Sequence, residues 1–315
     1  MTAPLKVGVV GVGSLGQWHA RVYAELPDVT LAGVYDVDAA RAREIADRYH
    51  TRVFAALDDL LAAVEAVSIA TPPQDHCSAA CRIMAAGRHV LVEKPIAATP
   101  EEAERMVALA REKQVILQVG HIERFNPVYA HLERLLTRPR YIEAMRLAPY
   151  PPVRPGLPPR GTEVSVVLDL MIHDIDIVLQ LVRSPVRELR AVGVPVLSPF
   201  EDVANAWLAF ENGCVASITA SRISAEKVRR IRAFQPDTHV ALDYANQSGH
   251  VHRRVGGAIV SAEVPIEKGD ALASELRSFV DCVRQRGEPV VSGEHGQLAL
   301  NLALAICQHI RQGVP

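Results

Sequence analysis

Short apolar runs alternate with amphipathic segments along the first third of the chain. The apolar runs have the length of buried strands and comprise Lys6–Val10, Thr30–Tyr35, Val67–Ala70, His89–Val92 and Val115–Val119. Apolar residues recur at helical spacing between them, in Leu15–Leu26, Ala39–Tyr49, Gln74–Ala86 and Pro100–Lys113. Buried strands that alternate with helices predict an α/β domain over residues 1–120, with a doubly wound parallel sheet covered on both faces.

The pattern changes after residue 120. A short helix at Pro127–Leu136 precedes a Pro/Arg-rich stretch, Ala148–Arg160, which is expected to be a loop because proline lacks an amide proton. A long helix is expected at Glu163–Val182, and the chain closes with helices at Leu272–Arg286 and Gly296–Arg311. The strand-like runs are Glu188–Val196, Val203–Phe210, Val215–Ser221, Arg229–Phe234, Thr238–Tyr244 and Ala258–Pro265. They predict a second, α+β domain over residues 121–315 with an open, largely antiparallel sheet.

Composition excludes several classes of protein. The chain has 315 residues, 49% of them hydrophobic, and a formal net charge of −2. A disordered chain would be more polar, and a general nucleic-acid-binding protein would be basic. We see no apolar run of about 18 residues, as a membrane span needs, and no signal-peptide pattern at the N-terminus. The five cysteines form no Cys-x-x-Cys pair, which favours reduced thiols and a cytoplasmic location.

A Gly-x-Gly-x-x-Gly motif follows the first predicted strand and opens the first predicted helix. It comprises Gly11, Val12, Gly13, Ser14, Leu15 and Gly16. Gly11 permits a tight turn, Gly13 lets the backbone approach a pyrophosphate, and Gly16 allows close packing of helix on strand. The amides at the helix N-terminus then bind the phosphates. This order of elements predicts a Rossmann dinucleotide-binding domain.

Asp36 ends the second predicted strand, 20 residues after Gly16. A carboxylate at this position accepts hydrogen bonds from the ribose hydroxyls and repels a 2′-phosphate. The sequence therefore predicts NAD rather than NADP as the cofactor. The alternative, a tight turn followed by a surface aspartate, has less support because strand, glycines and acid occur in the expected order.

Two polar segments follow strands of the same predicted sheet, at the edge where ligands bind in such folds. Thr71 and Pro72 follow one strand, and Glu93 and Lys94 follow the next. A lysine at such a strand end can hydrogen-bond a nicotinamide ribose and a substrate hydroxyl. Taken alone, Glu93 and Lys94 are more often a solvated ion pair than a catalytic one.

Polar residues form one stripe on the long helix of the second domain. Asp169, His173, Asp176 and Gln180 are spaced i, i+4, i+7 and i+11, and the rest of the helix is almost wholly apolar. Such a stripe should face a cavity or a partner, because unpaired buried carboxylates are costly. Histidine titrates near neutrality, so His173 suits a general base for an alcohol proton, and Asp169 could orient it.

Two other interpretations of this stripe stay open. It can be a structural His–Asp pair, which is about equally common before the cofactor domain is considered. Asp169, His173 and Asp176 could also bind a metal, but no further histidine or cysteine ligand is evident, so no metal site is predicted. A dinucleotide site in the same chain favours the catalytic interpretation, because alcohol oxidation needs a base.

Taken together, these segments resemble the Gfo/Idh/MocA family of NAD(P)-dependent sugar dehydrogenases over essentially the whole chain. The matching pieces are GVVGVGSLGQWHA, ATPPQDH, VLVEKPIA, DLMIHDID and EPVVSGEHGQLALNLALAI. The resemblance implies that Lys94, Asp169 and His173 carry the chemistry and contact the substrate, with Lys94 and His173 as candidates for the proton relay. It also implies homodimers or homotetramers through the second sheet, and further cofactor contacts from Thr71, Pro72, His76, Glu93 and Lys94.

A narrower resemblance is to those members that oxidise the 3-hydroxyl of UDP-N-acetylglucosamine to a ketone in the lipid A amino-sugar route. It is carried by VGHIERFNP at residues 119–127 and by residues 166–182 and 229–247. Arg124, at the domain junction, is the best single candidate for a substrate contact. Other cations could bind a diphosphate, although at least as often they are solvated or at an oligomer interface: Arg138, Arg140, Arg146, Arg154, Arg160, Arg222, Lys227, Arg229, Arg230 and Arg232.

One departure from the family pattern precedes Asp169. Many members have a Gly-Gly pair there, whereas this chain has Gly161 followed by Thr162. One alternative is therefore a dehydrogenase of a free sugar or polyol such as myo-inositol or glucose. A non-catalytic NAD-binding regulator is a further alternative, against which the presence of both Lys94 and His173 argues.

Overall fold

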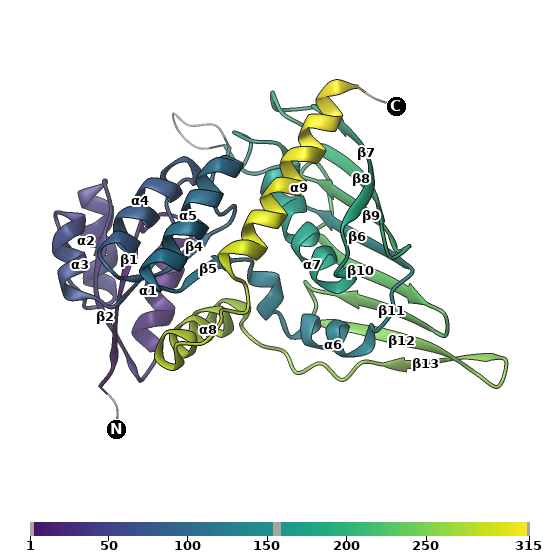
Figure 1. Ribbon diagram of the computed structural model, residues 1–315, viewed down its shortest axis with the longest axis horizontal. Coiled ribbons are helices and arrows are strands. Elements are labelled where there is room, and N and C mark those ends of the chain that lie inside the picture. Colours follow the sequence, from purple (N-terminus) through teal and green to yellow (C-terminus); the bar gives the residue numbers. More distant parts are fainter. Residues whose placement is uncertain (1–2, 154–158, 314–315) are drawn as a thin grey trace. The chain divides into compact units, whose positions relative to one another are not determined.

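The computed structural model describes residues 3–153 and 159–313. The chain forms two compact units, shown in Figure 1: unit 1 comprises Met1–Ile122 and Asp270–Leu298, and unit 2 comprises Glu123–Gly269 and Ala299–Pro315. The first passage between units lies close to the boundary predicted at residue 120. The prediction that residues 121–315 form one continuous domain is wrong, because residues 270–298 return to unit 1.

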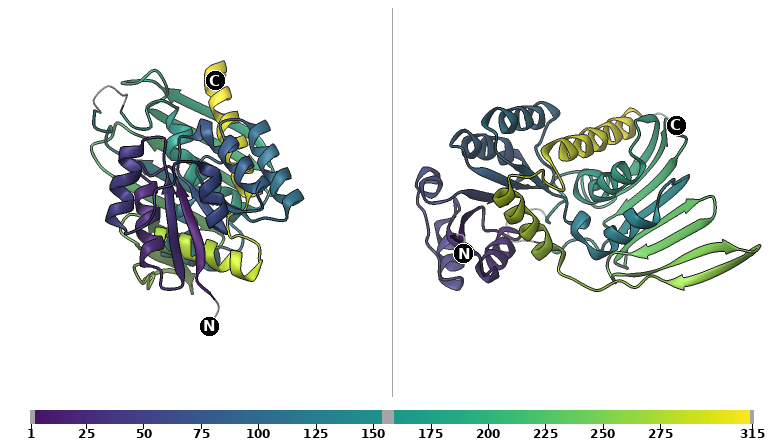
Figure 2. Two further views of the ribbon diagram at one scale, coloured as in Figure 1. Left: turned by 90° about the vertical axis from the view of Figure 1, so that its left-hand side faces the viewer. Right: turned by 60° about the horizontal axis from the view of Figure 1, so that its bottom comes forward.

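Unit 1 is built on a five-stranded parallel sheet with strand order β2-β1-β3-β4-β5. The strands are β1 (Leu5–Val10), β2 (Val29–Tyr35), β3 (Ala66–Ile69), β4 (His89–Glu93) and β5 (Leu117–Gly120). Helices pack around the sheet (Figures 1 and 2): α1 (Gly16–Glu25), α2 (Ala39–Arg48), α3 (Leu57–Ala63), α4 (Pro73–Ala85), α5 (Pro100–Lys113) and α8 (Ala271–Gln285). The predicted doubly wound parallel sheet is confirmed, and its order reverses between β1 and β3, where such folds bind ligands.

Helix α8 explains why the late segment belongs to unit 1. Asp270 caps the helix by accepting hydrogen bonds from the amides of the second and third residues after it. The apolar face, with Leu276, Phe279 and Val280 fully buried, joins the same core cluster as β1 and α1. Arg277 also donates two hydrogen bonds, of 2.9 and 2.7 Å, to the carboxylate of Asp28. Burial of these apolar side chains supplies most of the stabilisation, since a half-exposed ion pair contributes about 1 kcal/mol or less.

Unit 2 contains an eight-stranded sheet with strand order β13-β12-β11-β10-β6-β9-β8-β7. Every neighbouring pair is antiparallel except β6 and β9, so the prediction of a largely antiparallel sheet is confirmed. Helices α6 (Pro127–Leu135) and α7 (Ile172–Val182) and the later part of α9 (Gly293–Gln312) pack on one face (Figure 1). The strands are β6 (Tyr141–Leu147), β7 (Val186–Val194), β8 (Val203–Phe210), β9 (Val215–Ser221), β10 (Val228–Gln235), β11 (Thr238–Asp243), β12 (Ser248–Val255) and β13 (Ala258–Glu263).

Several elements differ from those that the sequence predicts. Helix α3 and strands β6 and β12 were not predicted. The helix expected at Glu163–Val182 is shorter: it starts as a π-helical turn, η2 (Val167–Met171), and continues as α7. No helix in the described part of the chain is long and apolar enough to cross a membrane.

Candidate functional site

The glycine motif forms the turn between β1 and α1. Gly11 has a positive φ of 80°, which a side chain would strain, and an ideal Cβ on Gly16 would lie 1.8 Å from the carbonyl oxygen of Gly11. No described heavy atom lies within 4 Å of an ideal Cβ on Gly13, so this stretch of backbone is open to a ligand. Helix α1 begins here, and within the described structure no side chain caps its first amides. The geometry fits the phosphates of a dinucleotide.

Asp36 is held at the end of β2 by two backbone amides. Its Oδ2 accepts a hydrogen bond of 2.7 Å from Val12, and its Oδ1 accepts one of 2.9 Å from Asp38. The carboxylate borders a cavity of about 430 Å³ in unit 1. Gly11, Gly13, Thr71 and Pro72 border the same cavity, so the structure brings these predicted cofactor residues together.

His76 was also predicted to contact the cofactor. Its ring is fully buried, and its two nitrogens lie 2.9 Å from the carbonyl oxygens of Thr71 and Pro95. Burial lowers the pKa of this imidazole, against the opposing effect of the two carbonyls. His76 thus joins the segment after β3, whose Thr71 borders the cavity, to the segment after β4.

Glu93 and Lys94 lie at the end of β4. Glu93 is buried, and its Oε1 lies 3.0 Å from Nε2 of His19, which is also buried in α1. Its Oε2 accepts a hydrogen bond of 3.2 Å from the amide of Lys94. Burial alone would raise the pKa of Glu93, but His19 and Lys94 together lower it. The interpretation of Glu93 and Lys94 as a solvated ion pair is therefore wrong for Glu93, which is buried. The side chain of Lys94 is half-buried.

Two buried polar residues beside Glu93 were not predicted from the sequence. His19 lies on the face of α1 that also buries Gly16, Ala20 and Tyr23, so its helical spacing was an available signal. Glu275 lies on the apolar face of α8 and is fully buried, and neither carboxylate oxygen has a hydrogen-bond partner in the described structure. Burial and the charge of Glu93 raise the pKa of Glu275 well above its ordinary value.

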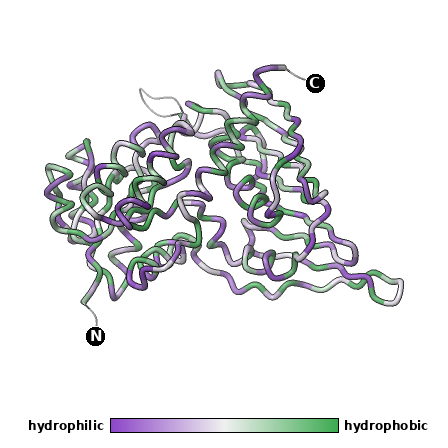
Figure 3. The backbone as a smooth tube through the Cα atoms, in the orientation of Figure 1, coloured by the Kyte–Doolittle hydropathy of each residue, from purple (hydrophilic) through white to green (hydrophobic). Residues whose placement is uncertain are grey.

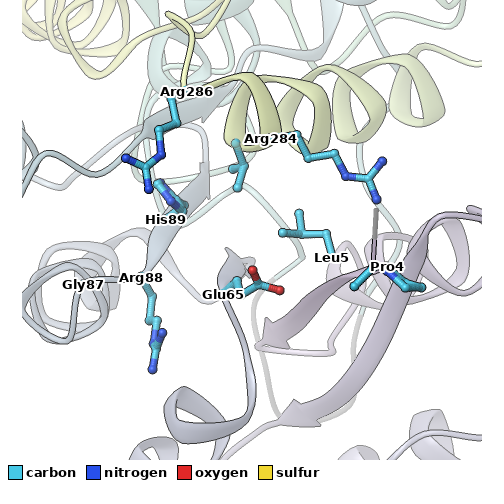
Figure 4. Close-up of a pocket in the computed structure, with 10 residues that line it drawn as sticks. Pro4, Leu5, Glu65, Gly87, Arg88, His89, Arg284 and Arg286 are labelled. Carbon is cyan, nitrogen blue, oxygen red and sulfur yellow. The ribbon is translucent and has the colours of Figure 1, made fainter. Parts of the chain in front are cut away.

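A second cavity of unit 1, of about 470 Å³, lies at the opposite edge of the parallel sheet (Figure 4). It is bordered by Leu5 at the start of β1 and by His89 at the start of β4. Burial lowers the pKa of His89, and the charges of Arg286 and Arg88 add to this effect. Glu65 lies among these cations, so the cavity carries mixed charge and is separate from the glycine motif.

In unit 2 the predicted polar stripe lies on η2 and α7. Asp169 is on the π-helical turn, His173 is on the first turn of α7, and both are half-buried. Asp176 is buried, whereas Gln180 is half-buried. The stripe therefore runs from a half-buried end that holds the proposed base to a buried middle.

A buried ionic network next to this stripe was not predicted. Arg146 donates to both oxygens of Asp174, at 2.7 and 3.1 Å, and to Glu123 at 2.8 Å. Arg229 adds a contact of 3.2 Å to Glu123. Burial alone would lower the pKa of Arg146, but the two carboxylates raise it. Two cations thus balance two carboxylates, and this network holds α7 to β6, β10 and the η1 helix (Ile122–Phe125).

Arg124, the predicted substrate contact, is almost buried in unit 2. Its side chain is 6% exposed, its Nη1 lies 3.6 Å from Oδ1 of Asp176, and its guanidinium lies 4.8 Å from the ring centre of Tyr129. Both charges of the pair are thus compensated. A substrate contact from Arg124 stays a prediction. Such a contact would compete with the ion pair between Arg124 and Asp176.

The other cations considered for a diphosphate fall into two groups. Arg146, Arg222, Arg229, Arg230 and Arg232 each form an ion pair with a carboxylate of unit 2. Arg138, Arg140, Arg160 and Lys227 are exposed, and Arg154 lies outside the described residues. Within residues 3–153 and 159–313, no group of three or more histidine, cysteine, aspartate or glutamate side chains could hold a metal ion.

Two segments of the chain match models of known protein families. Residues 5–121 match a family described as an oxidoreductase family with an NAD-binding Rossmann fold, and residues 133–235 match the C-terminal domain of GFO/IDH/MocA proteins. The chain belongs to the Gfo/Idh/MocA family of oxidoreductases and has its NAD-binding Rossmann domain, which confirms the family resemblance.

One relative is similar over both units. The UDP-N-acetylglucosamine 3-dehydrogenase of Acidithiobacillus ferrooxidans is 38% identical over 309 residues, which are 96% of each chain. A solved structure of that enzyme has a TM-score of 0.93 with 37% sequence identity and covers 99% of both chains. The scyllo-inositol 2-dehydrogenase (NAD(+)) of Bacillus subtilis is 26% identical over 100% of this chain and 96% of its own length. Similarity is thus greater to the nucleotide-sugar enzyme than to this polyol enzyme.

Proposed function

We propose that this chain is a cytoplasmic NAD-dependent dehydrogenase that oxidises the 3-hydroxyl of UDP-N-acetylglucosamine to a ketone. The observation that carries the substrate is the 38% identity to the UDP-N-acetylglucosamine 3-dehydrogenase, because it extends over 96% of both chains. The glycine turn, Asp36 and the bordering cavity support binding of NAD. Five cysteines that are buried free thiols support a reducing compartment.

In the proposed mechanism, His173 takes the proton of the reacting hydroxyl as the carbon–oxygen bond becomes a carbonyl. Bound NAD would supply the acceptor for the hydride that leaves the carbinol carbon. Asp169, one turn before His173, orients the imidazole and balances the charge that it gains. Lys94 hydrogen-bonds the hydroxyl oxygen and is the alternative base. The amides of the glycine turn and the Asp36 carboxylate bind the phosphates and ribose.

A substrate panel tests this proposal. The purified chain is incubated with NAD and, separately, UDP-N-acetylglucosamine, N-acetylglucosamine, myo-inositol or glucose, and NADH absorbance is followed. We expect NADH with the nucleotide sugar, and a slower rise in absorbance, from NADPH, when NADP replaces NAD, because Asp36 repels a 2′-phosphate. Oxidation of only the free sugars would support the polyol alternative. No NADH with any compound would contradict the proposal and favour an NAD-binding regulator.

We further propose that copies of the chain associate through the sheet of unit 2. The edge strand β7 exposes Val192 and Val194, while Gly193 between them faces Ile310 of α9. Hydrophobic positions also lie near the end of the hairpin of β12 and β13 (Figure 3). Ile259 and Val260 of β13 are exposed. Such apolar exposure is typical of an interface. Light scattering should give a mass at least twice the 34.3 kDa of one chain, and a monomeric mass would refute the association.

A further inference from the structure

Arg222, directly after β9, forms an ion pair and hydrogen bonds with residues of unit 2. Its side chain is 2% exposed, and its Nε donates a hydrogen bond of 2.8 Å to Oδ1 of Asp202. Its Nη2 donates to the Ser198 hydroxyl at 3.0 Å and to the carbonyl of Glu201 at 3.1 Å. Its Nη1 donates to the carbonyl of Gly161. A guanidinium can make this set of bonds because its donors form a rigid fork, so Arg222 ties the end of β9 to two other segments, Gly161 and residues 198–202.

Asp202 fixes the position of that guanidinium. The carboxylate is fully buried, and its Oδ2 accepts hydrogen bonds from the amides of Val196, Leu197 and Ser198 at 2.9, 2.6 and 2.9 Å. Burial alone would raise the pKa of Asp202, but hydrogen bonds from Arg222, from the amides of Leu197 and Val196 and from the Ser198 hydroxyl hold that pKa below its ordinary value. The pair is thus charged and anchored to backbone, and Arg222 has little freedom to move.

The segment that Arg222 holds lies against the Asp169 carboxylate. Gly161 has a φ of 83°, and an ideal Cβ on it would lie 2.4 Å from Oδ2 and 2.8 Å from Cγ of Asp169. The start of the π-helical turn is tied to the same place, since the amide of Val166 donates to the carbonyl of Glu201 at 2.9 Å. Only a residue without a side chain leaves the carboxylate where it is.

We propose that Gly161 and Arg222 are positioning residues for Asp169. Arg222 fixes the Gly161 peptide, and that peptide determines where the Asp169 carboxylate lies relative to its own helix. The inference rests on the proposed role of Asp169 in orienting His173. Neither residue touches the reacting atoms in this scheme: both act through the aspartate. It also gives Gly161 a reason to be glycine although the family's Gly-Gly pair is absent here.

The test compares two glycines with nearly the same positive φ. Gly213, in the turn between β8 and β9, has a φ of 82°, and no described heavy atom lies within 4 Å of an ideal Cβ on it. Gly213→Ala therefore introduces the backbone strain alone, whereas Gly161→Ala adds a collision with Asp169. We expect Gly213→Ala to keep kcat within about twofold of wild type, and Gly161→Ala to lower kcat at least about tenfold with the KM for NAD unchanged.

Removing the aspartate separates positioning from loss of structure. In an Asp169→Ala background the collision is gone, so adding Gly161→Ala should change kcat by less than about twofold, and the two effects should not multiply. A double variant whose loss equals the product of the single losses would overturn the inference. If Asp169→Ala reduces kcat but Gly161→Ala has the wild-type kcat, the positioning inference is overturned and the proposed role of Asp169 stands. Asp169→Ala with wild-type kcat overturns the proposed role of Asp169 and the inference together.

A second variant covers the case in which Gly161→Ala does not fold. Arg222→Lys keeps a charge beside Asp202, but an ammonium cannot reproduce the guanidinium's fork to Gly161, Ser198 and Glu201. We expect a lower kcat, an unchanged KM for NAD and a displaced pH profile of kcat, because the base is no longer oriented as before. A folded Arg222→Lys protein with the wild-type kcat and pH profile would overturn the inference.

Discussion

The His173→Ala protein is expected to lose about 10²- to 10⁴-fold in kcat with UDP-N-acetylglucosamine and to bind NAD as wild type does. Without the imidazole, the hydroxyl proton must pass to a less well placed acceptor while the hydride leaves. Unit 1 holds the glycine turn and the Asp36 cavity, and His173 lies in unit 2. Turnover and the dissociation constant of NAD, measured on the same preparation, separate loss of the base from loss of cofactor binding.

His252→Ala is the matched control for this prediction. His252 is a half-buried histidine of the same unit, on β12, and its ring lies 5.0 Å from that of His239. Its removal should leave kcat near the wild-type value. Added imidazole should restore part of the activity of His173→Ala, because a small base can occupy the vacated space. If His173→Ala turns over at the wild-type rate, the base is another residue, and Lys94→Ala becomes the decisive variant.

The sequence predicts those parts of the fold whose periodic pattern is complete within one segment. The parallel strands of unit 1 are continuous apolar runs, and the glycine turn needs only the order strand, glycines, helix. Strand β6 was not predicted because its third inward-facing residue is Arg146 rather than an apolar residue. Arg146 can be buried there because two carboxylates from elsewhere in the chain compensate its charge. Strand β12 was not predicted because Val251 is its one buried residue. For β6 the missing signal thus depends on partners elsewhere in the chain, and for β12 it is the scarcity of buried residues.

The residues of the candidate site also fall into those that the sequence predicts and those that it does not. Lys94, Asp169 and His173 stand out in sequence because their segments combine strand ends or helical spacing with polar residues. The residues that hold them do not: Arg222 reaches Gly161 across 61 positions, and Arg146 reaches Asp174 across 28. A single sequence gives no means of pairing such charges. His19 and Glu275 are intermediate cases: their place on apolar helix faces can be read from the sequence, but their proximity to Glu93 cannot.

Glu275→Gln is expected to stabilise the protein increasingly as the pH rises. Because the pKa of Glu275 is raised in the folded state, the folded chain retains a proton that the unfolded chain loses above about pH 4.3. Between the unfolded and the folded pKa, folding therefore requires proton uptake, and stability falls by about 1.4 kcal/mol per pH unit. Glutamine is neutral at every pH and similar in shape, so the variant lacks this loss.

The measurement is the difference in melting temperature between Glu275→Gln and wild type at several pH values. The difference should be small near pH 4, where both side chains are neutral, and should grow to a few degrees towards neutral pH. Asp281→Asn on the same helix is the control, because its carboxylate is 45% exposed and contacts Arg277 at 3.5 Å. It should not raise the melting temperature at any pH. A Glu275→Gln difference that does not change with pH would show that Glu275 is ionised in the folded protein, and that Glu93 and Glu275 carry two adjacent buried charges.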